Sequence, residues 1–207
     1  LVREKGLAEF CDVFCEKNVF EIEESRYLLE AAKSMGFKLK LHADEIASLG
    51  GTELGCELGA VSCDHLLQAS DHGIKALASS KTIATLLPCT AFSLKESYAR
   101  GRRMIDEGCA VALASDLNPG SCFTQSIPFL IALACYNMNF TLEEAITALT
   151  INGAAALGRE NKIGSIDIDK QADLVILKYP SYKFLLYNVA TNIVDRVIKK
   201  GKIIYQR

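Results

Sequence analysis

Several features are absent from this sequence of 207 residues, and each absence argues against a class of protein. No apolar stretch reaches the roughly 18 residues that a membrane-spanning helix needs, so we expect no role in a membrane. No charged and then apolar signal segment opens the chain, so we expect a cytoplasmic protein. A large charge excess is also lacking, because the net charge is −2, and this argues against nucleic acid or an anionic membrane surface as the partner.

Closely paired cysteines and abundant histidines are missing as well. None of the eight cysteines stands in a C-x-x-C pair, and Cys63 and Cys109 lie inside apolar runs. This usage favours reduced, buried thiols in a cytosolic protein, and the alternatives are a disulfide scaffold or a thiolate zinc site. The chain has three histidines, His42, His65 and His72, so the position of each one is informative.

What the sequence does contain is a regular alternation of two kinds of segment. Short apolar runs recur along its first part, and segments with helical spacing separate them. Strands and helices that alternate in this way are typical of βαβ units and a parallel sheet. Five units are too few to close an eight-stranded barrel, which leaves an open doubly wound sheet or part of a barrel. The five runs are residues 11–15, 37–42, 60–66, 82–88 and 109–116.

The pattern changes after residue 120. Residues 127–158 have helical spacing, and Thr141 followed by Glu144 predicts a capping box at a helix start. From residue 161 the chain has short strands with charged turns, which predict the hairpins of a small β unit. We therefore expect two domains, residues 1–160 and residues 161–207.

Three of the predicted strands end on an ionisable residue, namely His42, His65 and Asp116. The carboxyl ends of strands in an α/β sheet meet at one mouth, where active sites are built. A histidine at a single strand end is more often a satisfied structural side chain than part of a site. Three together indicate a site, because buried ionisable groups are costly without partners or a metal ion.

Glu45 lies three residues after His42, where a turn can bring it over the same mouth. A neutral imidazole is a good zinc or iron ligand, and a nearby carboxylate can take a proton from a metal-bound water. An ordinary loop is the alternative for this stretch. We expect Asp44 to face solvent or cap a helix, His72 to lie at the surface or in a cap, and the charges of residues 100–108 to form a solvated helix face.

These strings together carry a family resemblance. HADE after one strand, DHL after the next, LLP after a third and then SDLNPGS resemble the imidazolonepropionase family of the amidohydrolase superfamily. HADE together with SDLNPGS is the specific part, since many amidohydrolases and deaminases share an HxxE pair. The resemblance implies hydrolysis of 4-imidazolone-5-propanoate to N-formimidoyl-L-glutamate in histidine degradation. It also implies one divalent zinc or iron ion in a (β/α)8 barrel, followed by strands of a small β-sandwich.

The resemblance also implies roles for individual residues. His42 and Asp116 match metal ligands of the family, and Asp116 can also accept a proton from water. Glu45 matches a residue that contacts the substrate and moves protons. His65 matches a histidine near the reacting carbonyl, where it would polarise the carbonyl or stabilise the oxyanion.

The stretch after Asp116 matches the family loop that holds the substrate. Asn118, Gly120 and Ser121 occupy the matching positions, and we expect Gly120 to leave backbone N–H groups open to an anionic group. One small departure is Asp169, which stands where relatives have glycine in a turn. Aspartate tolerates left-handed backbone, so we expect the turn to be kept.

The larger departure is the absence of any His-x-His pair, which in the family supplies two metal ligands. The five predicted strands match the fourth to eighth of the barrel, so we expect the chain to be the C-terminal portion of the enzyme. The isolated chain should then bind metal poorly, turn over no substrate, and associate with itself or with the missing half. Two alternatives stay open: another cyclic amidohydrolase or nucleobase deaminase, and an inactive fragment that acts only in assembly.

Overall fold

The computed structural model describes residues 1–207, and the chain divides into two compact units. Residues 1–87 and 97–112 form the first unit, and residues 88–96 and 113–207 form the second. Five strands lie in one sheet in the order in which they occur along the chain, and β1 to β4 pair in parallel. This confirms the predicted α/β sheet. The strands are β1 (Phe10–Cys15), β2 (Lys38–Ala43), β3 (Ser62–His65), β4 (Ile83–Leu86) and β5 (Val111–Leu113).

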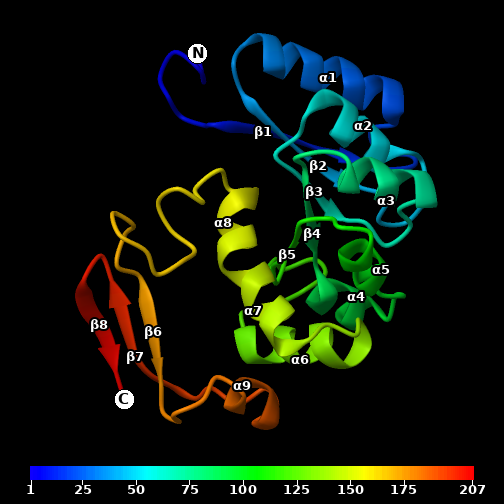
Figure 1. Ribbon diagram of the computed structural model, residues 1–207. Helices are drawn as coiled ribbons and strands as arrows, with labels where there is room; N and C mark the ends of the chain where they lie inside the picture. Colours follow the sequence, from blue (N-terminus) through cyan, green and yellow to red (C-terminus); the bar gives the residue numbers. More distant parts are fainter. The chain divides into compact units, whose positions relative to one another are not determined.

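Helices of the first unit cover one face of β1, β2 and β3. Helix α1 (Ile22–Ser34) packs on β1 and β2, and α2 (Gly51–Leu58) packs on β2 and β3 (Figure 1). Helix α3 (Asp71–Ala78) packs on α2, and α5 (Gly101–Asp106) precedes β5. Gly36 follows the end of α1 with a φ of +83°, a left-handed conformation that commonly ends a helix.

The alternation along β2 separates a covered face from a polar face. Leu39 and Leu41 are buried beneath the helices, each burial contributing about 1.5–3 kcal/mol, while Lys40 and His42 point to the opposite face and are half-buried. In the strand register Phe14 lies beside His42, and His42 lies beside Asp64, so these side chains share the polar face. A parallel sheet is normally buried by apolar residues on both faces. This sheet departs from that pattern on one face, where polar and ionisable side chains lie.

The second unit contains helices and a small antiparallel sheet. The predicted capping box at Thr141 is confirmed, because Thr141 and Glu144 exchange side-chain to backbone hydrogen bonds at the start of α7. The sheet has the order β6-β7-β8, and β7 and β8 form a hairpin as predicted. The other predicted hairpin is wrong, because residues 162–173 contain no strand and only β6 follows them. Asp169 has a φ of +65° in the turn before β6. The elements are α4 (Pro88–Leu94), α6 (Ile127–Asn137), α7 (Leu142–Leu149), α8 (Ile151–Ala156), β6 (Leu174–Leu177), α9 (Phe184–Tyr187), β7 (Val194–Lys199) and β8 (Lys202–Gln206).

Two predicted boundaries are wrong. Strand β5 ends at Leu113 rather than at Asp116, and Asp116 itself has a left-handed φ of +54° that a strand ladder does not accommodate. Pro88 was expected to end a strand but begins α4, where its fixed φ suits the first turn of a helix. None of the helices has both the length and the apolar character needed to cross a membrane.

Candidate active site

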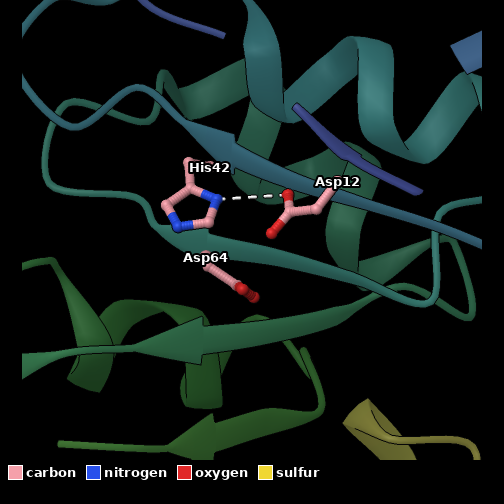
Figure 2. Close-up of side chains that lie close together, drawn as sticks. All are labelled: Asp12, His42 and Asp64. Atoms are coloured by element: carbon pink, nitrogen blue, oxygen red, sulfur yellow. Dashed lines mark hydrogen bonds and ion pairs between the residues drawn. The ribbon is translucent and has the colours of Figure 1, made fainter. Parts of the chain in front are cut away.

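Three ionisable side chains meet on the polar face of the sheet. Asp12 on β1, His42 on β2 and Asp64 on β3 place their ligand atoms within 4.8 Å of one another, a grouping that could hold a metal ion. Figure 2 shows the His42 ring facing Asp12, and the Nδ1 of His42 lies 3.1 Å from the Oδ1 of Asp12. The edge of the Phe14 ring also contacts the imidazole, with the ring centroids 5.8 Å apart. Asp12 and Phe14 thus fix the orientation of His42.

His65 and Glu45 lie next to this group. The His65 ring is centred 5.3 Å from the His42 ring, and its Nδ1 lies 3.4 Å from the Oε1 of Glu45. His65 has a side chain that is 4% exposed and a φ of +76°, a conformation that costs a non-glycine residue energy and is concentrated at functional sites. The structure therefore brings the predicted residues His42, Glu45 and His65 together.

Asp44 does not face solvent, so that alternative for it is wrong, while the expected capping role is confirmed. The Asp44 side chain is fully buried, and its carboxylate accepts hydrogen bonds from the backbone N–H groups of Gly51 and Thr52 at the start of α2. The physical reason is local: Gly50 precedes this helix and has no side chain to satisfy the first N–H groups. His72, by contrast, is 85% exposed, as predicted.

Asp116 belongs to the second unit and has its own set of contacts. The Thr90 hydroxyl donates a hydrogen bond of 2.7 Å to the Oδ2 of Asp116. The side-chain amide of Asn118 donates to the Asp116 backbone carbonyl over 2.9 Å. The Asp116 carboxylate is half-buried and is oriented by a hydroxyl that approaches one of its two oxygens.

The loop after Asp116 is held in a turn by hydrogen bonds of its own Asn118 side chain. The Oδ1 of Asn118 accepts the backbone N–H groups of Gly120 and Ser121, each over 2.8 Å, and the Asn118 amide donates to the Ser121 hydroxyl. The expectation that Gly120 leaves its N–H open is therefore wrong, because an asparagine side chain readily makes such a turn. A Cβ at Gly120 would lie 3.2 Å from the Oδ1 of Asn118, so a larger residue here would press on the oxygen that closes the turn.

Cysteine chemistry does not operate beside this loop. All eight cysteines are free thiols, and Cys89 and Cys122, which lie next to Thr90 and Ser121, are buried. Burial raises the pKa of Cys89 to about 12, and the neighbouring Cys122 thiol contributes to the same shift. Since the thiolate is the reactive form, Cys89 is an inert packing residue at neutral pH.

Comparison with known proteins identifies the family. The model of the amidohydrolase family matches residues 16–204. The chain belongs to the amidohydrolase family. The first unit contributes the sheet and the His42 group to this amidohydrolase, and the second contributes Asp116 and its loop.

Curated relatives of this amidohydrolase chain are about twice its length. It is 65% identical to a protein named imidazolonepropionase from Clostridium tetani, over 100% of this chain and 49% of the relative. It is 63% identical to an imidazolonepropionase from Parabacteroides distasonis, over 98% of this chain and 49% of the relative. The chain spans about half the length of these relatives and matches their C-terminal half.

Solved structures share the fold of this amidohydrolase. Ochratoxinase from A. niger superposes with a TM-score of 0.79 at 18% identity, covering 99% of this chain and 54% of that one. An adenosine deaminase from Xanthomonas campestris, solved with bound zinc, superposes with a TM-score of 0.74 at 19% identity, covering 89% of this chain and 49% of that one. At these identities the likeness shows the fold, which confirms that the sheet is part of an amidohydrolase barrel.

Sequence reasoning missed several residues that contact the predicted site residues or their neighbours in each unit of this amidohydrolase. Glu16 directly follows β1, so the criterion that selected His42 and His65, an ionisable residue at a strand end, would also have found it. Asp12 and Asp64 lie within strands, and their exposure on the polar face depends on which face the helices cover. Thr90 carries no signal in the sequence, because a threonine in the first turn of a helix is ordinary.

Proposed function

We propose that this chain is the C-terminal half of an imidazolonepropionase that hydrolyses 4-imidazolone-5-propanoate to N-formimidoyl-L-glutamate in histidine degradation. The observation that carries the proposal is the cluster of His42, Glu45 and His65, formed by the two motifs HADE and DHL on adjacent strands. The identity of 65% to an imidazolonepropionase supports it. The reduced thiols favour the cytoplasm as the compartment.

The metal ligands in this proposal are His42 and Asp116, and two further histidines would come from the upstream half. Imidazole and carboxylate are donors that suit zinc or iron, so His42 and Asp116 fit such an ion, and the carboxylates of Asp12 and Asp64 lie beside His42. When bound, a divalent ion would make hydroxide available near neutral pH. Asp12 would hold the Nδ1 of His42 and so present Nε2 to the ion.

The remaining residues would act on the substrate and its protons. Glu45, at its carboxylate, would take a proton from the attacking water and deliver it to the ring nitrogen that leaves. His65, oriented by Glu45, would donate a hydrogen bond to the carbonyl oxygen as negative charge develops there. Asp116 would accept the second proton of that water, which is released as the product carboxylic acid ionises. The substrate's formimino and carboxylate ends would be bound by the loop of Asn118, Gly120 and Ser121, through groups other than the Gly120 N–H, which Asn118 already accepts.

The same proposal assigns the domains. Residues 1–160 would supply five of the eight βα units of the barrel, and residues 161–207 would supply strands of a β-sandwich. The upstream half would complete both, so we propose that it is the natural partner of this chain, with self-association as the alternative when that half is missing. Nucleic acid and membranes have no part in this proposal.

The test uses the full-length protein, meaning this chain together with the upstream half that its relatives have. We expect it to hydrolyse 4-imidazolone-5-propanoate and to leave guanine and cytosine unchanged. Deamination of either base would instead support the second candidate, a nucleobase deaminase, which the HxxE pair of His42 and Glu45 would also fit.

A matched experiment on the 207-residue chain alone tests whether its two proposed metal ligands are enough to bind the ion. We expect less than stoichiometric metal by elemental analysis and no turnover, because two ligands make a weak site. Stoichiometric metal together with measurable turnover would show that the chain is a complete enzyme.

A further inference from the structure

We propose that Glu16 is a positioning residue that holds Glu45 against His65. This inference rests on the proposed function, since it concerns the same site. Glu16 contacts neither of the two side chains, and it would act through the backbone that carries Glu45.

Glu16 is a buried carboxylate tied to a distant loop. It directly follows β1, and its relative exposure is 0%. The Oε2 of Glu16 accepts the N–H of Ile46 over 2.9 Å, and its Oε1 accepts the N–H of Ala47 over 3.1 Å. Its only other side-chain contact is the N–H of Lys17, at 2.8 Å. Both long-range hydrogen bonds therefore go to the two residues that immediately follow Glu45.

The residue before Glu45 is held from the opposite side. The backbone carbonyl of Asp44 accepts the N–H of Gln68 over 2.8 Å, and the carbonyl of Ala43 accepts the N–H of Leu66 over 3.1 Å. Leu66 directly follows His65. The backbone on one side of Glu45 is therefore hydrogen-bonded to the segment that follows His65, and the backbone on the other side is hydrogen-bonded to Glu16. These bonds hold Glu45 where its side chain lies 3.4 Å from His65.

The chemistry of the anchor requires a carboxylate. An ionised carboxylate presents two acceptor oxygens and no donor, so it can satisfy two N–H groups that approach different oxygens. A glutamine of the same shape would direct its NH2 group at one of the two loop amides, and that bond would be lost. The loop would then be held on one side only, and Glu45 would lose its fixed distance to His65.

The experiment compares Glu16→Gln with a control, Glu53→Gln, in the full-length protein. Glu53 is a half-buried carboxylate of the same unit that accepts the Ser70 hydroxyl over 2.6 Å, and its hydrogen bonds do not involve the residues around Glu45. We expect Glu16→Gln to lower kcat by about 10- to 100-fold, with KM changed by less than about threefold, because misplacing a catalytic group affects the chemical step. Hydrogen exchange at the amides of Ile46 and Ala47 should accelerate in Glu16→Gln and stay unchanged in Glu53→Gln.

Two results would overturn the proposal. One is a normal kcat in Glu16→Gln although exchange at Ile46 and Ala47 has accelerated. The other is a loss of activity in both variants in proportion to their loss of folded protein. If Glu16→Gln fails to fold, Glu16→Asp, which draws the carboxylate back by one methylene, is measured in its place. We expect the same lowered kcat with a nearly unchanged KM.

Failure of the proposed function is distinguishable from failure of this inference. If the unsubstituted full-length protein does not hydrolyse 4-imidazolone-5-propanoate, the function is wrong, and crystal structures of the protein with and without Glu16→Gln then decide the positioning role. We expect the contact between Glu45 and His65 to be lost in the variant. An unchanged contact would refute the role of Glu16.

Discussion

Replacing Asp44 with alanine should destabilise the protein strongly, because Asp44 is the acceptor for the start of α2. Its buried carboxylate accepts five hydrogen bonds, four from consecutive backbone N–H groups and one from the Thr52 hydroxyl. Water can reach the first amides of this run, but Gly51 and Thr52 are buried. Two unsatisfied buried donors cost about 2–6 kcal/mol, and alanine at a φ of +49° adds about 1–2 kcal/mol.

The assay is urea unfolding followed by far-ultraviolet circular dichroism, and the expected loss for Asp44→Ala is about 3–8 kcal/mol. Asp44→Asn is the matched control, because asparagine tolerates left-handed backbone and keeps one acceptor oxygen. We expect it to lose about half as much as alanine. A loss below about 1 kcal/mol for alanine, or equal losses for the two variants, would refute the reasoning, since a typical surface substitution changes stability by less than that.

Three other predictions concern single contacts. The hydrogen bond from Lys199 holds the pKa of Asp173 down at about 2, so the stabilisation from this pair is present above about pH 4 and is lost as the pH falls through about 2. The difference in melting temperature between the protein and Asp173→Asn should vanish at about pH 2, and a difference independent of pH would contradict this. Thr90→Val removes the donor to Asp116 and should weaken metal binding by the full-length protein by about 10-fold, measured by competition with a chelator; unchanged affinity would show that the hydroxyl does not orient the ligand. Cys89, with its pKa raised to about 12, should resist iodoacetamide at about pH 8 in the folded protein and react in urea, as read by mass spectrometry. Rapid labelling of the folded protein would show that the thiol is exposed.

The fold could be predicted from the sequence largely because the spacing of apolar residues along a segment indicates which of its faces is buried. The alternation in β2, with Leu39 and Leu41 on one side and Lys40 and His42 on the other, indicates a strand with one apolar face. The end of β5 could not be predicted in the same way. Ala114 and Ser115, which follow Leu113, are small and compatible with a strand, and the left-handed backbone of Asp116 has no signal in the sequence.

The site could be predicted in part, for the same kind of reason. His42 and His65 are ionisable residues at strand ends, and the geometry of a parallel sheet brings such positions together. The burial of Asp44 could not be foreseen, because it depends on where the start of α2 lies in three dimensions. The error about Gly120 has a similar origin, since its N–H is taken by a side chain two residues away.

The central claim is that Glu45 moves protons in a metal-dependent hydrolase built from this chain and an upstream half. The measurement that tests it most directly is the turnover of 4-imidazolone-5-propanoate by the full-length protein with and without Glu45→Gln, alongside its metal content. The account predicts that kcat falls by at least about 100-fold, the scale of general acid–base catalysis, while the bound metal and the folded fraction stay unchanged. A Glu45→Gln variant that turns over the substrate at the rate of the unsubstituted protein would contradict it.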